Sequence, residues 1–384
     1  MTGPFSNSSR IPRPPRTATV AEPRSGLHVL HVVEALGSGI ATALEDYLRS
    51  TPGHTHTVLA YRRPSAQTGD QLEQLATRLV LLPTGRLAQV RAVRRWVREL
   101  RPDLVHAHST YAGLYVRLFA RAPGTPLVYT PHAYPFERRD VPPPVRALYW
   151  LVEAALSLGG GCVAAAGPHE AELAARLPGR QAVVHLPNVV RGVRRAAPGP
   201  PGDHPPGREL RLVANGRISP QKGPDFFARA VRLSRARGLP LRWIWVGGGR
   251  PDDEQALRDA GALVTGWLPR ESALQWLATA DVYVHTAAWE AFPVSVLEAA
   301  ALDLPILARR IAALEALGVA RLCDTPEAMV AAAGTLLDGR QRAALRSRSR
   351  LLADRHRPDA QQEALERAYA IASGRPRTPL RGRT

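Results

Sequence analysis

The chain has 384 residues, a formal net charge of +18 and 45% apolar residues, which favours a globular protein with two domains over one small core. Cys162 and Cys323 lie far apart and lack CxxC spacing, which excludes a disulfide framework and a cysteine-based zinc site. We expect both to be reduced core residues. No uninterrupted apolar run reaches the length of about 18 residues that a spanning helix needs, so no such helix is predicted.

Arginines gather at both ends of the chain. Residues 1–26 and 374–384 hold four arginines each, against one glutamate in the first segment and no acid in the second. The first segment lacks the apolar region of a secretion signal, so we expect a disordered basic leader, and a basic tail at the other end. The charge suits an anionic membrane or anionic substrate, with solvated arginines as the alternative. Because basic residues do not interleave with aromatic ones, we expect no nucleic-acid partner.

Short apolar runs alternate with helical patterns over residues 27–190. Such alternation is typical of a parallel sheet covered by helices on both faces. The helical spacing is clearest over 41–48. The expected strands cover 27–33, 56–62, 79–83, 104–109 and 127–132.

The alternation stops at residues 191–209, whose proline, glycine and charge predict a linker. It resumes over 210–356, which predicts a second α/β domain, and 357–373 is expected to form a helix that crosses back to the first domain. Ligands of open parallel sheets bind at the carboxyl ends of strands, so we expect a cleft between the domains. The strands expected in the second half cover 210–216, 241–249, 262–268, 282–287 and 304–308.

The most specific motif, NGRISPQKG (215–223), follows the first strand of the second half. Arg217 and Lys222 are expected on a loop that leads into a helix beginning near Pro224. Two cations beside a helix N-terminus suit a diphosphate, because the helix amides and dipole bind an anion and the side chains neutralise it.

A second motif, WEAFPVSVLEAAALDLPIL (289–307), follows the strand expected over 282–287. Glu290 is expected on a loop and Glu298 in the following helix, with Pro293 in the first helical turn. These carboxylates can contact different parts of one extended ligand, since carboxylates accept hydrogen bonds from sugar hydroxyls. By themselves, two such glutamates are more often surface charges; beside the loop of Arg217 and Lys222 they favour a binding site.

The region Gly216 to Leu307 resembles the C-terminal domain of the family-four retaining glycosyltransferases, whose GT-B fold has two facing Rossmann-like domains. The resemblance implies that Arg217 and Lys222 hold the donor diphosphate. It also implies that Glu290 faces the transferred sugar and Glu298 the ribose. The nucleotide base would lie near Leu268. The remaining donor-binding candidates of this region are Gly216, Phe292, Pro293 and Val294.

The first half resembles the same family more loosely. The segment EALGSGIATALEDYL (34–48) is similar to its glycine-rich first loop, where Gly37 and Gly39 would let the backbone approach a phosphate or the acceptor. An ordinary flexible turn is the alternative. Residues 102–117 resemble a strand and loop at the cleft, which makes His108 and Ser109 candidates for the acceptor side.

Two further segments extend this resemblance. VYTPHAYPF (128–136) is similar to the strand that ends in the family's cleft histidine, which implies that His132 lies near the donor sugar; a satisfied core histidine is the alternative. VVHLPNVV (183–190) is similar to the end of the family's first domain. Several family glycines are replaced, which leaves the donor, the acceptor and the level of activity open. The replacing residues are Ala133, Val189, Ala291 and Asp303.

Breaking the bond between a sugar and a nucleotide diphosphate builds negative charge on the leaving phosphate. A cationic clamp can stabilise this charge, so we expect no metal and no cofactor besides the nucleotide-sugar co-substrate. Asp252 and Asp253 are expected near a helix N-terminus and not in a metal site. The catalytic candidates are His132, Glu290, Arg217 and Lys222.

Residues 85–102 predict an amphipathic helix with an arginine-rich face, on which Trp96 is expected near the edge. Such a helix can lie on anionic lipid or simply cover the sheet. The expected apolar side contains Leu87, Val90, Val93, Val97 and Leu100. We expect a cytoplasmic protein, with the inner face of the cell membrane as a candidate location.

The sequence therefore predicts a retaining, metal-independent glycosyltransferase with a glycan or lipid-linked acceptor, acting in bacterial surface polysaccharide or glycolipid assembly. A nucleotide-sugar epimerase of the same fold and a degenerate relative that serves as a partner subunit are the alternatives. A phosphorylase would need a cofactor lysine site, and none is identified.

Overall fold

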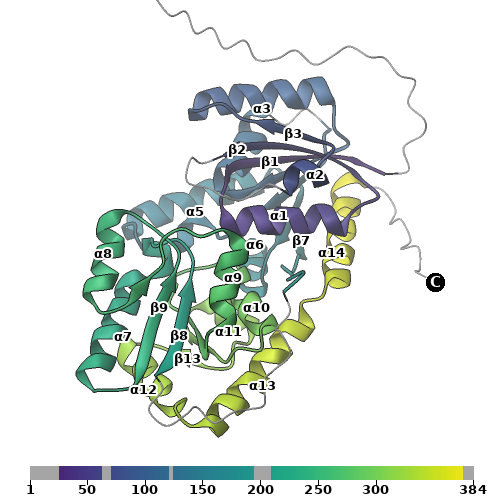
Figure 1. The fold of residues 1–384 in the computed structure, drawn as a ribbon. Coiled ribbons are helices and arrows are strands. Elements are labelled where there is room, and N and C mark those ends of the chain that lie inside the picture. Colours follow the sequence, from purple (N-terminus) through teal and green to yellow (C-terminus); the bar gives the residue numbers. More distant parts are fainter. Residues whose placement is uncertain (1–25, 63–70, 121–123, 194–208, 375–384) are drawn as a thin grey trace, which may run out of the picture.

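The computed structural model describes residues 26–62, 71–120, 124–193 and 209–374. The expected basic leader, linker and basic tail lie almost wholly outside these ranges. The described residues form two lobes, each built on a parallel sheet with helices on both faces (Figure 1). None of the described helices combines the length and apolarity needed to cross a membrane.

The first sheet has seven strands in the order β3-β2-β1-β4-β5-β6-β7, all paired in parallel. Its strands are β1 (His28–Leu36), β2 (Thr55–Arg62), β3 (Arg78–Leu81), β4 (Leu104–His108), β5 (Leu127–Thr130), β6 (Cys162–Ala165) and β7 (Ala182–His185). The central strands β4, β5 and β6 are buried along their whole length, as expected for strands covered on both faces, although β4 buries two histidines, His106 and His108.

The second sheet has six parallel strands in the order β10-β9-β8-β11-β12-β13. They are β8 (Leu210–Asn215), β9 (Leu241–Val246), β10 (Leu263–Val264), β11 (Val282–His285), β12 (Ile306–Arg309) and β13 (Leu322–Cys323). In the first sheet β2 and β3 lie on one side of β1 and β4 on the other; in the second sheet β9 and β10 lie on one side of β8 and β11 on the other. At such a switch point the loops after neighbouring strands diverge and leave room for a ligand.

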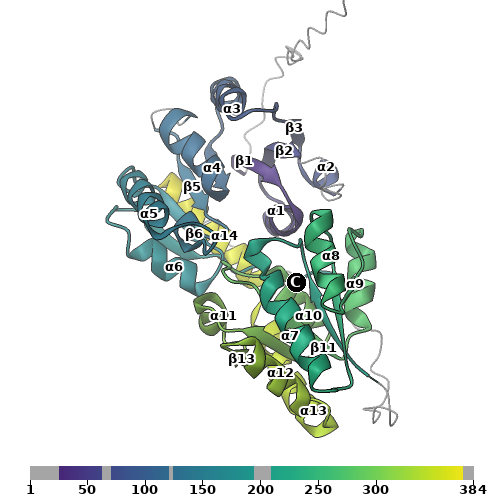
Figure 2. The same cartoon turned by 90° about the vertical axis from the view of Figure 1, so that its left-hand side faces the viewer.

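Helices of the first lobe cover both faces of its sheet. α1 lies on one face, while α3, α4 and the π-helical turn η1 pack on the other. The helical segments are α1 (Ser38–Ser50), α2 (Leu72–Leu75), α3 (Arg86–Leu100), α4 (Ser109–Tyr115), η1 (Val116–Ala120), η2 (Pro135–Glu137), α5 (Pro143–Ser157) and α6 (Pro168–Ala175). α5 lies at the outer edge of the lobe (Figure 2).

The second lobe is covered in the same way. Its helical segments are η3 (Pro220–Lys222), α7 (Pro224–Ala236), α8 (Pro251–Asp259), α9 (Arg270–Ala278), α10 (Val294–Ala301), α11 (Ala312–Leu317), α12 (Pro326–Thr335) and α13 (Gly339–Arg355). Phe227 of α7 packs edge-on against Trp243 and Trp245 of β9 in the core.

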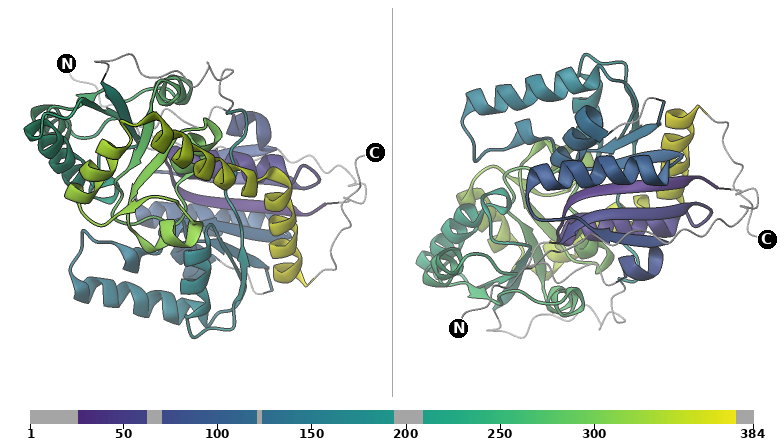
Figure 3. Two further views of the ribbon diagram at one scale, coloured as in Figure 1. Left: turned by 90° about the horizontal axis from the view of Figure 1, so that it is seen from below. Right: turned by 90° about the horizontal axis from the view of Figure 1, so that it is seen from above.

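The last helix, α14 (Pro358–Ser373), follows α13 out of the second lobe and lies on the first sheet beside α1 (Figure 3). Leu365 and Tyr369 of α14 are fully buried, and the helix packs on β4, β5, β6 and β7. Gln361 donates from Nε2 to the Pro187 carbonyl at 2.9 Å and accepts from the Ser50 hydroxyl at 2.8 Å. Because α14 continues from α13 of the second lobe and packs on the first lobe, it connects the two lobes.

Several local predictions need correction. The strands β6, β7 and β13 are only two to four residues long, and the sequence pattern did not reveal them as strands. β5 ends at Thr130, so His132 belongs to the following loop. In α3, Trp96 is buried and Leu87 is 76% exposed, because the helix turns Val93, Trp96 and Val97 onto the sheet. Cys162 and Cys323 are buried free thiols, as predicted.

Candidate active site

A cleft of about 380 Å³ lies between the two lobes and receives residues from both sheets. All residues predicted at the donor site and all predicted catalytic residues line this cleft. They are Gly37, Gly39, His132, Gly216, Arg217, Lys222, Leu268, Glu290, Phe292, Pro293, Val294 and Glu298. The folded chain thus brings together candidates that are up to 261 positions apart, as Gly37 and Glu298 are.

The loop that carries Lys222 is held by contacts of its backbone. Lys222 ends the short turn η3, and its carbonyl accepts a hydrogen bond from the Thr286 hydroxyl at 2.9 Å. Gly223 follows in the left-handed conformation with φ of 65°. A Cβ at Gly223 would lie 2.2 Å from the Thr286 carbonyl oxygen, so only glycine allows this approach. The position of Lys222 relative to the end of β11 is therefore fixed.

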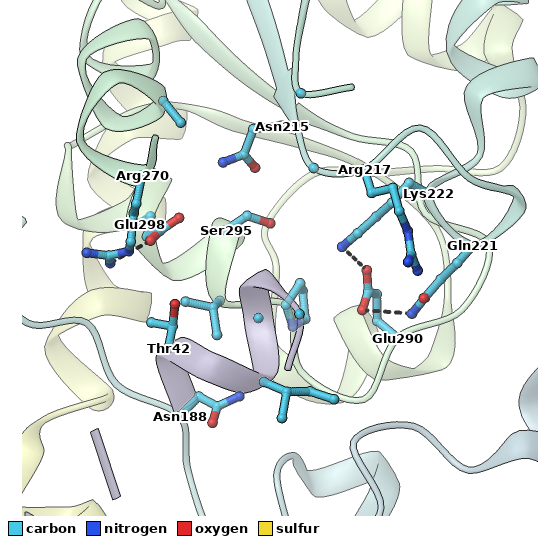
Figure 4. A pocket seen from close by; sticks show the side chains of 18 of the residues that line it. Thr42, Asn188, Asn215, Arg217, Gln221, Lys222, Arg270, Glu290, Ser295 and Glu298 are labelled. Carbon is cyan, nitrogen blue, oxygen red and sulfur yellow. Dashed lines mark hydrogen bonds and ion pairs between the residues drawn. The ribbon is translucent and has the colours of Figure 1, made fainter. Parts of the chain in front are cut away.

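Lys222 forms the closest polar contact of the cleft. Its Nζ lies 2.5 Å from Oε1 of Glu290, and Nε2 of Gln221 donates to Oε2 of the same carboxylate at 3.4 Å (Figure 4). Arg217 lies on the same side of the cleft. Glu290 is only 7% exposed, so its charge requires a partner. Lys222 is also the sole lysine of a sequence that otherwise uses arginine for its fixed cations.

Glu298 occupies the opposite side of the cleft (Figure 4). It projects from α10 and accepts a hydrogen bond from Nη2 of Arg270 at 2.7 Å. Burial raises the pKa of the Glu298 carboxyl, and the Arg270 guanidinium opposes this rise. Pro293 is the residue before the first turn of α10, one position earlier than predicted. The two glutamates are thus separated across the cleft, each beside its own cation.

Two helices begin at the cleft. α1 starts after Gly37 and α10 starts after Pro293, and neither first residue is capped by a side chain. Both helix starts line the cleft and leave backbone amides for a ligand. Together with Arg217 and Lys222 they make the cleft suited to a large anion such as a diphosphate.

Three site residues had no assigned role before the structure. Tyr47 donates to Oδ1 of Asn188 at 3.2 Å, and Nδ2 of Asn188 donates to the Phe292 carbonyl at 3.3 Å. This relay joins the first lobe to the loop that carries Glu290. Asn188 stands in the LPN segment that the sequence singled out, whereas the pairing of Arg270 with Glu298 leaves no local sequence signal.

The acceptor-side candidates do not line the cleft. His108 is fully buried, with its Nδ1 3.3 Å from Nε2 of His132 and its Nε2 3.0 Å from Nδ1 of His31. It therefore lies behind the cleft histidine and cannot contact an acceptor directly. Ser109 begins α4 with φ of 73°, and its hydroxyl is buried without a hydrogen-bond partner in the described residues.

Two of the replaced glycines keep a glycine-like backbone. Ala133 has φ of 81° and Asp303 has φ of 58°, conformations that cost a residue with a Cβ about 1–2 kcal/mol each. The Ala133 amide donates to Oε1 of Glu170 at 2.8 Å, and the Asp303 carboxylate is held by both nitrogens of the Arg350 fork. These bonds help to hold the strained loops, so the replacements preserve the backbone path of the site.

A second cavity of about 540 Å³ adjoins the cleft and shares Glu290 with it. Arg139 of the first lobe and Arg309 of the second line this cavity. Asp252 and Asp253 lie elsewhere, in the first turn of α8, where Asp253 pairs with Arg250 at 2.9 Å. Their placement fits the predicted position near a helix N-terminus.

Two family descriptions match the chain in succession. Residues 38–189 match a glycosyl transferase 4-like domain, and residues 209–339 match glycosyl transferases group 1. Together they cover both lobes and the cleft. A curated relative from Klebsiella pneumoniae, an uncharacterized 41.2 kDa protein in a cps region, is 20% identical over 75% of this chain and 82% of its own length.

Solved structures share the two-lobed architecture. Anabaena HepE, solved in complex with UDP and glucose, matches 90% of this chain and 100% of its own, with a TM-score of 0.69 and 17% identity. Sucrose-phosphate synthase from Thermosynechococcus elongatus matches 90% of this chain and 98% of its own, with a TM-score of 0.72 and 16% identity. WaaG, a glycosyltransferase involved in lipopolysaccharide biosynthesis, matches 90% of this chain and 100% of its own, with a TM-score of 0.61 and 17% identity.

These likenesses confirm the predicted GT-B fold of two facing Rossmann-like domains. The matched family descriptions cover the loop of Lys222, the loop of Glu290 and the glycine-rich start of α1. The chain belongs to the group 1 glycosyltransferases and is a sugar-transferring enzyme.

Proposed function

We propose that this enzyme transfers a sugar from a nucleotide diphosphate sugar to a glycan or lipid-linked acceptor, without a metal and with retention of configuration, in bacterial surface polysaccharide or glycolipid assembly. The observation that carries the proposal is the separation of two buried carboxylates across one cationic cleft. HepE has been solved with UDP-glucose, WaaG is involved in lipopolysaccharide biosynthesis, and the Klebsiella relative lies in a cps region, all of which support this setting.

In the proposed complex the diphosphate lies between Arg217, Lys222 and the starts of α1 and α10. As the bond to the sugar breaks, negative charge grows on the leaving phosphate, and fixed cations and amides stabilise it in the transition state. Lys222 and the two helix starts can provide this stabilisation, which is why the proposal includes no metal. Glu290 lies beside the sugar position, and Glu298 accepts the ribose hydroxyls. The cavity on the other side of Glu290 leaves room for an acceptor.

The donor site predicts selective binding of one nucleoside diphosphate. We expect UDP, GDP or ADP to raise the melting temperature of the purified protein, and EDTA to leave this rise unchanged. Glu298→Ala and Arg217→Ala should each weaken binding about tenfold or more, since each removes a charge-assisted hydrogen bond worth about 1.5–3 kcal/mol. Arg229→Ala, which removes an exposed arginine paired with Glu327, is the matched control.

Calorimetry with the stabilising nucleotide measures these affinities, and the anomeric coupling constant of the product in a proton NMR spectrum tests retention. Binding that disappears with EDTA would contradict the metal-independent mechanism. No binding of any nucleotide would contradict the donor site itself, and an inverted anomeric centre would contradict retention alone.

We also propose that the protein binds an anionic membrane surface, and that the contacting helix is α5 and not α3. The apolar face of α3 covers the sheet, whereas α5 exposes Leu148, Leu151, Val152 and, just beyond its end, Leu158 by 39–67%. Leu148, Leu151 and Val152 share one side of the helix because their spacing is three and four residues. An exposed apolar face on a protein with a net charge of +18 suits the surface of anionic lipid.

We therefore expect the protein to float with vesicles that contain anionic lipid and to stay unbound with neutral ones. The double variant Leu148→Ser and Leu151→Ser should lower binding about tenfold or more, because burial of each leucine contributes about 1.5–3 kcal/mol. Ile371→Ser, which changes an exposed apolar residue of α14, is the control. Equal flotation of the double variant and the control would refute the role of α5.

A further inference from the structure

Histidines form a row across the first sheet, on the face that α1 and α14 cover. His56 lies on β2, His31 on β1, and His106 and His108 on β4, with His31 directly opposite His106 in the strand pairing. All four are nearly or fully buried. Burial of so many imidazoles requires partners for their ring nitrogens, because an unpaired polar group in the core is destabilising.

Four histidines in this region are linked one to the next by hydrogen bonds. Nδ1 of His56 lies 3.1 Å from Nε2 of His31. Nδ1 of His31 lies 3.0 Å from Nε2 of His108, and Nδ1 of His108 lies 3.3 Å from Nε2 of His132. These hydrogen bonds thus lead from His56, near the start of β2, to His132, which lines the cleft.

The hydrogen bond at the His56 end of this row of histidines determines the direction of all the others. Nε2 of His56 lies 2.9 Å from the Thr51 carbonyl oxygen, which only accepts, so this nitrogen carries the proton. In a neutral ring Nδ1 of His56 is then an acceptor, and His31 must donate to it from Nε2. By the same reasoning, His108 donates from Nε2 to Nδ1 of His31, and His132 donates from Nε2 to Nδ1 of His108. Its Nδ1 remains an unprotonated acceptor, with no hydrogen-bond partner among the described residues.

The surroundings keep these rings neutral. Burial lowers the pKa of His31, His56, His106, His108 and His132, and the neighbouring histidines lower it further for His31, His106 and His108. The charged or titratable groups around the row are Tyr47 of α1, Tyr369 and Glu366 of α14, His28 at the start of β1 and His54 just before β2. The Thr51 carbonyl and Glu366 favour a charged His56, but burial outweighs them, and in the described residues no carboxylate pairs with a ring of the row.

A metal site is the competing use of this cluster, since nitrogens of His31, His106 and His108 lie within 4.8 Å of one another. The hydrogen bonds argue against it. Both nitrogens of His31 and both of His108 are used within the chain, and those of His106 face the Thr130 hydroxyl at 2.9 Å and the Tyr369 hydroxyl at 3.2 Å. A metal would have to break several of these bonds.

We propose that His56, His31 and His108 are positioning residues that hold His132 in one tautomer and orientation, with Nδ1 free to accept a hydrogen bond from a hydroxyl of the donor sugar. The inference rests on the proposed donor site for its substrate, but the hydrogen-bonded chain exists in the protein alone. Without the chain, His132 would sample both tautomers and several ring orientations, and only some of these would accept from a sugar hydroxyl.

The tautomers are tested by long-range ¹H–¹⁵N NMR on the full-length protein labelled with ¹⁵N at histidine, at pH 7.5 and without ligand. We expect the neutral Nε2–H form for His56, His31, His108 and His132, each assigned by its Gln variant. His106→Gln is the matched control: it removes the nearest ring outside the chain and should leave the His132 signals unchanged. A neutral Nδ1–H form or a protonated ring at His132 would overturn the proposal. So would binding of one equivalent of Zn²⁺ that shifts these signals, because it would show a metal site.

The effect on the donor is tested with two variants of one residue. His108→Gln keeps an amide N–H for His31 and a carbonyl oxygen for His132, whereas His108→Leu removes both. We expect the leucine variant to raise the donor KM about 3- to 10-fold, as for one lost hydrogen bond, and the glutamine variant to restore most of it. Nucleoside diphosphate affinity should be equal in both. Equal donor KM values in the two variants would overturn the positioning role, whereas loss of nucleotide binding in the unmodified protein would refute the proposed donor site and leave the tautomer result standing.

Discussion

Replacing Lys222 by arginine is expected to lower kcat about 10²- to 10³-fold, although the positive charge is kept. Removal of one donor that stabilises a developing anion costs about this much in other enzymes. Arginine cannot replace the ammonium here, because a planar guanidinium needs more room than a compact ammonium. The Lys222 stem already lies close to Gly216, where an added Cβ would be 3.3 Å from Cε. The retention of one lysine in a chain that otherwise uses arginine supports the same conclusion.

Initial rates of donor consumption measure this effect, with nucleotide affinity as a test of folding. The control is Arg229→Lys, which replaces an arginine by a lysine in the exposed ion pair with Glu327. It should leave kcat within about twofold, because surface ion pairs contribute little. An amine-specific reagent gives an independent readout, since Lys222 and the N-terminal amine are the only primary amines of the chain. Nucleotide should protect Lys222 from the reagent. A Lys222→Arg enzyme with nearly full activity would show that only net charge matters.

Acid is expected to destabilise the folded protein strongly between pH 7 and pH 5. Burial lowers the pKa of His56 and of His132 to about 4 in the folded state, and lowers the pKa of His31, His106 and His108 as well. The unfolded chain therefore takes up protons as the pH falls through about 6.5, while the folded protein does not. For His56 and His132 the loss of stability by pH 5 is roughly 2 kcal/mol each.

Three buried carboxyls act in the opposite direction. Burial raises the pKa of Asp46 to about 6 and that of Glu170 to about 7 in the folded state, and it raises the pKa of Glu298 as well. These groups bind protons before the unfolded chain does, so they add stability as the pH falls. The buried histidines outnumber these carboxyls, since the pKa of His285 is lowered by burial as well, so we expect a net loss of stability by pH 5.

Urea unfolding followed by circular dichroism at several pH values measures this loss. His31→Gln should make stability less dependent on pH, because it removes one buried imidazole. His169→Gln should not, since the hydrogen bond to Glu137 raises the pKa of His169 and its contribution has the opposite sign. A urea midpoint that stays constant from pH 8 to pH 5 would mean that the histidine row is already charged or open to solvent.

Local sequence patterns were sufficient for most of the strands and for the two cleft loops. The loop from Asn215 to Gly223 was predictable because cations, proline and a left-handed glycine stand in one short segment that folds by itself into a turn before α7. The family resemblance assigned the same segment to a donor site. In contrast, β6, β7 and β13 were missed; their short length does not explain this, since strands as short as β5 and β10 were predicted.

The misplacement of His108 shows what the sequence could not decide. The segment LVHAHS is typical of a strand end with polar residues that face a cleft. Only the pairing of β4 with β1 and the cover by Tyr47 of α1 place His108 in the core. Trp96 is a similar case, because the rotation of α3 on the sheet decided which of its residues are buried. In both cases the sequence pattern did not show whether the side chain faces the core or the surface.

The sequence by itself determined the α/β class, the two halves and many of the residues that line the cleft, because these depend on periodicity and on motifs of neighbouring residues. Only the tertiary structure decided that Arg270 pairs with Glu298, that Asn188 joins the lobes and that His56, His31 and His108 lead to His132. Such contacts depend on strand register and lobe packing. These are set by the sum of many weak interactions along the whole chain, and no short segment records them.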